Sequence, residues 1–215
     1  MLKIGVLASG RGSNFQSMID AIEAGRINAR MGLLVVDKAG AYALERAKNH
    51  NIPHRFIDPK GFQDKDAFYA EIAAQMKEHN IGLVVLAGFM RIVRKPLLDA
   101  FPNAVMNIHP ALLPSFPGLH GQGDAVSYGV KLSGCTVHFV DEGMDTGPVI
   151  IQAAVPVYDD DTEDSLSARI LKQEHRIYPE AIRLFAEGRL EVRGRKVIIR
   201  GQSRQDDVAI INPPL

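Results

Sequence analysis

The chain has 215 residues, of which 46% are hydrophobic, so it is long enough to bury a sizeable core in one large domain or two small ones. Lys plus Arg and Asp plus Glu each number 25, so the formal charge is zero, and no basic block marks an electrostatic track for nucleic acid. We expect small-molecule partners, with no nucleic acid and no membrane, because no apolar run approaches the roughly 20 residues of a membrane span.

The N-terminal residues, MLKIGVLASG, contain a short apolar run that predicts a first strand rather than a signal peptide. The single cysteine, Cys135, cannot form an internal disulfide, which agrees with a reducing compartment. We therefore expect a cytoplasmic protein.

Short apolar runs alternate with helical patterns through the first half of the chain. The apolar runs are Ile4–Leu7, Gly32–Val36 and Leu83–Leu86, and the helical patterns are Asn14–Glu23, Ala41–Lys48 and Pro96–Phe101. This alternation predicts an α/β fold with a Rossmann-like, mostly parallel sheet flanked by helices. Ligands in such sheets bind at the carboxyl ends of the strands. We expect one such edge to gather the segments that follow strands, namely Ser9–Gly10, Gly88, Asn107–Pro110 and Asp141–Gly147.

The loop after the first strand, ASGRGSN, is a candidate phosphate site, because backbone N–H groups and a helix dipole favour an anion there. Phe15 occupies the place of the third glycine of the dinucleotide fingerprint, so that motif fails. The alternative is a tight turn with Ser13 or Asn14 as a helix cap. Asp37 sits where a ribose-binding acid can follow a second strand, but we interpret it as a solvated turn residue.

The run Val105–His109 predicts a strand on which Asn107 and His109 share one face, because side chains alternate along a strand. The three prolines of PALLPSFPG then make a stiff loop that is suited to hold a ligand. An imidazole at a strand end beside an amide suits acid–base chemistry near neutral pH. The alternatives for His109 are a hydrogen-bonded core histidine and half of a metal site.

A further strand, Cys135–Val140, leads into DEGMDTGP, which contains three carboxylates. Asp145 competes with Asp141 and Glu142 as the partner of His109, and spacing alone does not choose among them. Cys135 and His138 fall on opposite faces of the strand, so we expect no metal site. The segment from Phe89 to Val93 mixes apolar bulk with one arginine, which indicates either core packing with a surface arginine or a wall for a flat ring system.

The last third predicts a long helix from about Thr162 to Tyr178, interrupted at Pro179, with Gly188 as a C-terminal glycine. Glu174 falls within its apolar stripe and needs a partner, either an arginine at the core edge or a ligand hydroxyl or amine. Leu190–Val192 and Val197–Ile199 predict a small hairpin. We expect a single domain over 1–200 and a loose tail over 201–215.

Taken together, the motifs ASGRGSN, VVLAGFMRI, NIHPALLPSFPG, GCTVHFVDEGMDTGP and QEHRIYP resemble the folate-dependent formyltransferase family, and within it the phosphoribosylglycinamide (GAR) formyltransferases of purine synthesis. The similarity runs from about Ile4 to Arg189. It implies transfer of a formyl group from 10-formyltetrahydrofolate, as co-substrate, to the amine of GAR. The transfer would be direct, through a tetrahedral intermediate, without a metal.

The resemblance also assigns roles to residues. It implies Asn107, His109 and Asp145 as the catalytic trio, which chooses Asp145 among the three acids. It implies GAR binding by Gly12, Ser13, Asn14 and Glu174. It implies a folate pocket formed by Met90, Arg91, Ile92, Val93, Asn107 and the backbone of Asp141, Glu142, Gly143, Met144 and Asp145.

Two places depart from the family pattern. Lys65 stands where the family often has an arginine in its folate site, and Gln122–Asp124 differs from the polar or basic sequence expected there.

The rival functions are a formyltetrahydrofolate hydrolase, which would not need the phosphate loop, and a nucleotide-binding oxidoreductase or ligand sensor. The protein is expected to be a monomer or a homodimer.

Overall fold

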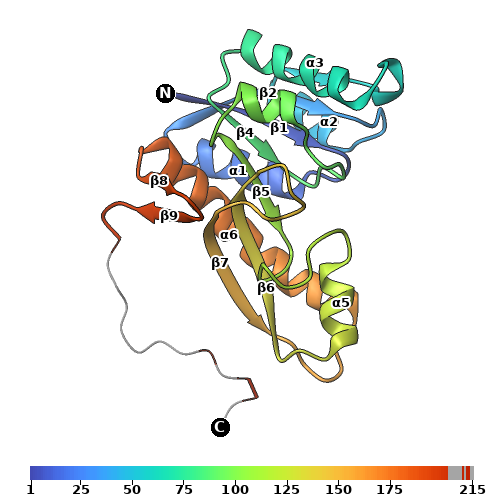
Figure 1. The fold of residues 1–215 in the computed structure, drawn as a ribbon, viewed down its shortest axis with the longest axis vertical. Helices are drawn as coiled ribbons and strands as arrows, with labels where there is room; N and C mark the ends of the chain where they lie inside the picture. The colour runs from blue at the N-terminus through green and yellow to red at the C-terminus, as the bar shows by residue number, and fades with distance from the viewer. Residues whose placement is uncertain (203–209, 211, 214–215) are drawn as a thin grey trace.

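A computed structural model describes residues 1–202, 210 and 212–213 and contains a nine-stranded sheet with strand order β3-β2-β1-β4-β5-β6-β7-β9-β8 (Figure 1). The strands are β1 (Leu2–Ala8), β2 (Ala29–Val36), β3 (His54–Phe56), β4 (Leu83–Leu86), β5 (Val105–His109), β6 (Leu132–Phe139), β7 (Val149–Pro156), β8 (Leu190–Arg193) and β9 (Lys196–Ile199). The first five are parallel, which confirms the predicted mostly parallel, Rossmann-like α/β sheet.

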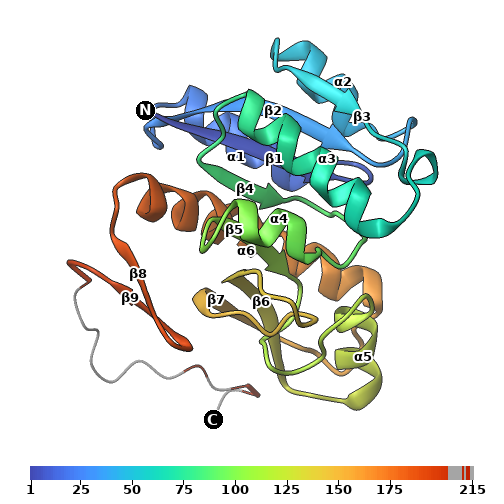
Figure 2. The same cartoon turned by 45° about the horizontal axis from the view of Figure 1, so that its top comes forward.

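Helices cover both faces of this sheet, as Figure 2 shows. The helices are α1 (Ser13–Glu23), α2 (Ala43–Asn49), α3 (Lys65–Glu78), α4 (Lys95–Ala100), α5 (Gly121–Tyr128) and α6 (Glu163–Ala186), with a short 3-10 helix at Pro59–Gly61. Helices α1, α2, α5 and α6 pack on one face, and α3 and α4 pack on the other. None of the described helices is long and apolar enough to cross a membrane.

The alternation of side chains on the central strands produces the two cores. On β4, Leu83 and Val85 face the α1–α6 side, while Val84 and Leu86 face α3 and α4. Because both faces are covered, these strands are continuous apolar runs. On β5, Met106 joins the α1–α6 core and Val105 the opposite one. Asn107 and His109 therefore emerge on the α3–α4 side, as the period of two predicts.

One expectation about topology was wrong: the strand before Asp141–Gly147 does not end at the carboxyl edge of the parallel strands. β6 runs antiparallel to β5, with Asn107 opposite His138 and His109 opposite Thr136. The segment that follows β6 therefore leaves from the end of β5 where Val105 lies, away from the carboxyl edge of the parallel strands. The sheet edge alone does not bring Asp141–Gly147 to the other loops.

The long helix was predicted too short. It begins after a capping box formed by Thr162 and Ser165, and it passes through Pro179 without interruption for 24 residues. Pro179 is buried, so we attribute the continuation to packing of this face on the sheet, which offsets the lost backbone hydrogen bond. Gly188, with φ of +67°, lies just beyond the C-terminal end.

The predicted hairpin is formed by β8 and β9. Its strand β9 is joined to β7 through one residue pair, Val149 with Lys196. The expected loose tail falls mostly on residues 203–209, 211 and 214–215, which lie outside the described residues. Within the tail, the Asn212 side-chain amide donates to the carbonyl oxygens of Lys131 and Val157. The division into a 1–200 domain and a tail stays a prediction.

Candidate active site

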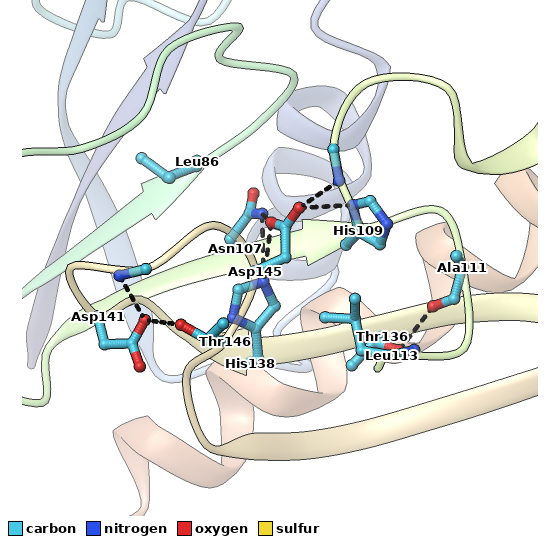
Figure 3. Close-up of polar contacts among 12 residues, drawn as sticks. Leu86, Asn107, His109, Ala111, Leu113, Thr136, His138, Asp141, Asp145 and Thr146 are labelled. Atoms are coloured by element: carbon cyan, nitrogen blue, oxygen red, sulfur yellow. Dashed lines mark hydrogen bonds and ion pairs between the residues drawn. The ribbon is translucent and has the colours of Figure 1, made fainter. Parts of the chain in front are cut away.

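Asn107, His109 and Asp145 lie together at the carboxyl end of β5 (Figure 3). Asp145 Oδ2 is 3.4 Å from His109 Nδ1, and Asp145 Oδ1 is 3.5 Å from Asn107 Nδ2. His109 is buried, and the Asp145 side chain is 14% exposed. A carboxylate in contact with an imidazole stabilises its protonated form. The cluster can therefore hold a proton beside a hydrogen-bond-donating amide.

Asp145 reaches this cluster because the loop between β6 and β7 folds back over β5. The Asp141 carboxylate accepts hydrogen bonds from Gly143 N and from Thr146 Oγ1, at 3.1 and 2.6 Å, and so closes the loop on itself (Figure 3). A Cβ at Gly147 would lie 1.8 Å from the carbonyl oxygen of Phe139, so only glycine permits this close return.

The proline-rich loop after β5 supplies two backbone groups to the same cluster. Gly118 N donates to Asp145 Oδ2 at 2.9 Å. His109 Nε2 lies 2.8 Å from the carbonyl oxygen of Phe116, and because a carbonyl only accepts, Nε2 carries the hydrogen. The Thr136 hydroxyl holds the base of this loop by donating to Ala111 O and accepting from Leu113 N (Figure 3).

A second histidine, His138, belongs to the cluster although no role was predicted for it. Its Nε2 lies 3.3 Å from Asn107 Nδ2 and 3.7 Å from Asp145 Oδ1. Burial lowers the pKa of His138 below its usual value, while the Phe139 carbonyl and the Asp145 charge oppose that shift. The signal that would have revealed it, its place opposite Asn107, comes from strand pairing rather than from local sequence.

A cavity of about 380 Å³ opens beside the cluster. Its lining is mostly apolar and comes from the ends of β4, β5 and β6 and from three loops: Leu86, Gly88, Phe89, Met90, Arg91, Ile92, Val93, Asn107, Ile108, His109, Pro110, Gly118, Leu119, His138, Val140, Gly143, Met144 and Asp145. This volume is in the usual range for a small-molecule site. The predicted wall Met90–Val93 lines it, as do Gly143 and Met144. Asp141 and Glu142 do not.

Lys65 lines a neighbouring cavity of about 660 Å³, which shares Met90, Arg91 and Ile92 with the first. Arg91 Nε donates to Asp37 Oδ2 at 2.6 Å, and the Asp37 side chain is 2% exposed. The interpretation of Asp37 as a solvated turn residue was therefore wrong, because a buried carboxylate needs such a partner. The pair anchors the wall shared by the two cavities.

Of the two glycines in the loop after β1, Gly12 has a backbone conformation that favours glycine. Gly12 has φ of +68°, and a Cβ there would lie 2.9 Å from the Cβ of Ala43. Helix α1 starts at Ser13, so free backbone N–H groups of its first turn face the loop. Arg46 Nε donates to the carbonyl oxygen of Arg11 and so supports the loop from α2.

Glu174 meets this loop from α6. Its Oε2 accepts a hydrogen bond of 2.7 Å from Asn14 Nδ2, and both side chains are buried. The partner is thus an asparagine and not the arginine that we considered. Burial raises the pKa of Glu174, and the Asn14 hydrogen bond lowers it in part. Asn14 Oδ1 has no hydrogen-bond partner among the residues that the structure describes.

The formyl transferase family matches residues 2–182. A phosphoribosylglycinamide formyltransferase of Bacillus subtilis is 44% identical over 85% of this chain and 94% of its own length. The crystal structure of glycinamide ribonucleotide transformylase 1 from Symbiobacterium toebii is 53% identical, with a TM-score of 0.91 over 93% of this chain and 94% of that one. The chain belongs to the phosphoribosylglycinamide formyltransferase family.

Membership in this family confirms the resemblance seen in the motifs and makes the chain a formyl-transferring enzyme. A trifunctional purine biosynthetic protein, adenosine-3, of Drosophila melanogaster is 45% identical over 86% of this chain, but this chain spans only 14% of that protein. The match to the Bacillus subtilis formyltransferase extends over nearly the whole of that relative.

Within this formyltransferase, two clusters lie at the carboxyl ends of two parallel strands, β1 and β5, that are separated in the sheet by β4. One follows β5 and contains Asn107, His109 and Asp145, and the other follows β1 and contains Gly12, Ser13, Asn14 and Glu174. Ser9 links β1 to the cavity wall, because its hydroxyl accepts from Met90 N and its own N–H donates to Gly88 O. Among the described residues, no group of three His, Cys, Asp or Glu side chains is arranged to hold a metal ion.

Proposed function

We propose that this chain transfers the formyl group of 10-formyltetrahydrofolate to the amine of 5'-phosphoribosylglycinamide, giving formyl-GAR and tetrahydrofolate. The observation that carries this proposal is the arrangement of Asn107, His109 and Asp145 on an apolar cavity of about 380 Å³. The buried Asn14–Glu174 pair beside the loop after β1 supports GAR as the acceptor.

In the proposed reaction the GAR amine attacks the formyl carbon, and the carbonyl oxygen takes up negative charge. The amine proton then passes to N10, and the bond between carbon and N10 breaks. One Asn107 Nδ2 hydrogen is directed at His138, while the other has only the 3.5 Å contact with Asp145 and can serve the formyl oxygen. Removing a donor of this kind from an oxyanion site lowers kcat by about 10²–10³-fold.

His109, held by Asp145, supplies the second donor and carries the proton. In the structure its Nε2–H is taken by the carbonyl oxygen of Phe116. The formyl oxygen or N10 has to replace that carbonyl as the acceptor, because Nδ1 faces Asp145. General acid–base assistance of this kind contributes about 10²–10⁴-fold.

The loop after β1 would hold the GAR phosphate through the backbone of Gly12, Ser13 and Asn14, because the first turn of a helix presents unpaired N–H groups. Glu174 would accept from the ribose hydroxyls or the glycinamide end. Asn14 Oδ1 is buried and has no partner within the described part of the chain, so it would accept from a donor on the same substrate.

The folate would lie between two walls. Met90, Arg91, Ile92 and Val93 form one, and the loop from Asp141 to Asp145 forms the other through Gly143, Met144 and Asp145. Asp141 and Glu142 are not among the residues that line the cavity, so this wall of the proposed folate pocket rests on the last three residues of the loop. Lys65, which lines the neighbouring cavity, would meet the acidic end of the folate beyond the ring.

The test is the rate of tetrahydrofolate release from 10-formyltetrahydrofolate by the purified protein, with and without GAR. Release that depends on GAR and yields formyl-GAR supports the transferase. Equal release with and without GAR, with formate as product, would show that the chain is a hydrolase instead. No release at all would indicate a binding protein.

A further inference from the structure

His138 lines the cavity and contacts Asn107. It lies on β6 directly opposite Asn107 on β5, and it is 2% exposed. The register of β6 against β7 shifts at this residue, since Val137 pairs with Ile151 and His138 with Val149. The extra residue in β7, Ile150, forms a bulge, a feature that often re-aims side chains beside active sites.

The hydrogen bonds of His138 define its protonation. Nδ1 lies 2.8 Å from the carbonyl oxygen of Phe139, which only accepts, so Nδ1 carries the hydrogen. In the neutral ring Nε2 then has a free lone pair, and the group 3.3 Å from it is Asn107 Nδ2, which only donates. The two contacts agree with a single tautomer.

The alternative state would disturb the site. A protonated His138 would present an Nε2–H to the Asn107 NH₂ group, so two donors would face each other. The amide would turn its oxygen toward His138 and take its N–H groups away from the cavity. The charged ring would also compete with His109 for Asp145, whose Oδ1 is 3.7 Å from His138 Nε2.

We propose that His138 is a positioning residue that, as a neutral acceptor, fixes the Asn107 amide with its N–H toward the formyl oxygen. This inference rests on the proposed function. His138 is surrounded by three titratable groups, His109 on β5 and Asp145 and Asp141 on the loop after β6. Burial favours the neutral ring, as does His109, whereas the two carboxylates favour the charged one.

The first experiment separates orientation from packing. His138→Leu removes the acceptor and should lower kcat by about 10–100-fold, which is less than the loss expected when the Asn107 donor itself is removed. The KM of both substrates should stay within about 3-fold of the wild-type values. His138→Gln restores an acceptor and should recover kcat to within about 5-fold. Val137→Ala is the matched control, because Val137 is fully buried next in the chain but faces the opposite core.

A double-mutant cycle decides whether the effect passes through Asn107. In an Asn107→Ala background, His138→Leu should lower kcat by less than about 3-fold, because the group it orients is gone. A merely structural role would give the full loss in both backgrounds and would overturn the proposal, as would His138→Leu behaving like Val137→Ala.

The second experiment does not need the reaction. Nitrogen-15 NMR of histidine-labelled protein at pH 7 should show His138 neutral, with hydrogen on Nδ1 and a free Nε2, and His138→Gln identifies the signal. A charged ring or the opposite tautomer would overturn the inference. If the wild-type protein makes no formyl-GAR, the proposed function fails, and the NMR result still decides the state of His138.

Discussion

Asn14 Nδ2 donates a 2.7 Å hydrogen bond to Glu174 Oε2 and so joins the first turn of α1 to the middle of α6 across 160 residues of sequence. Both residues are buried, and burial raises the pKa of the carboxyl group. A carboxyl whose pKa is raised by folding favours the folded state at low pH, and this contribution is lost as the pH rises through the folded pKa. Ionisation of Glu174, at a pH above its raised folded pKa, therefore lowers stability relative to the protonated form.

Glu174→Gln should move stability and binding in opposite directions. At pH 7 we expect the free energy of unfolding to rise by about 0.5–2 kcal/mol, because the buried charge is gone while Asn14 keeps a partner. The KM for GAR should rise at least about 10-fold. Urea unfolding at pH 4 and pH 7 checks the first part, since the gain should shrink at the lower pH. A stability loss at pH 7 would contradict the explanation.

Gly12→Ala should weaken GAR binding. The φ of +68° and the 2.9 Å approach to the Ala43 Cβ leave no room for a side chain, so we expect a loss of about 1–3 kcal/mol in stability and about a 10-fold higher KM for GAR. Gly10→Ala is the control, because a Cβ at Gly10 meets nothing within 4 Å. Steady-state kinetics with varied GAR give the KM of both variants. Equal KM values would show that Gly12 does not belong to a phosphate site.

Asp145→Asn should lower kcat by about 10²–10⁴-fold, because an amide does not stabilise a protonated His109. The KM for GAR should stay within a few-fold. Glu142→Gln, an exposed change on the same loop, should leave kcat at the wild-type value. If Asp145→Asn keeps kcat within about 3-fold of wild type, the catalytic trio is wrong.

Asp37→Ala should loosen the wall of the cavity. The buried carboxylate holds Arg91, which is 38% exposed on its side chain and can be hydrated when released. We expect a loss of about 1–3 kcal/mol in stability and a higher KM for 10-formyltetrahydrofolate with an unchanged KM for GAR. Asp99→Asn, which removes an exposed pair with Lys95, should change neither. An unchanged folate KM in Asp37→Ala would show that Arg91 needs no anchor.

Local pattern predicted the central strands well. β4 and β5 have the predicted bounds, because each is a continuous apolar run between turn residues. The same reasoning failed at Pro179, where packing of a buried helix face outweighs the local preference of proline. It also failed at Asp37, because the partner that allows burial, Arg91, lies 54 residues away.

The local sequence pattern could not predict that β6 runs antiparallel to β5, because side chains alternate in the same way along parallel and antiparallel strands. The proximity of Asp145 to His109 was expected from a shared sheet edge, but it results from a loop that returns from the opposite end. His138 was passed over for the same reason, because its contact with Asn107 exists only through that pairing.

That returning loop carries both a wall of the cavity and the Asp145 carboxylate. Under the proposed function its order therefore affects both the KM for the co-substrate and kcat. Loosening it, for example by removing the Asp141–Thr146 hydrogen bond, would weaken co-substrate affinity and slow turnover together. A change on the rigid strand at Asn107 would instead act mainly on turnover. Under the proposed function, part of the affinity for the co-substrate is in this way coupled to the alignment of Asp145 with His109.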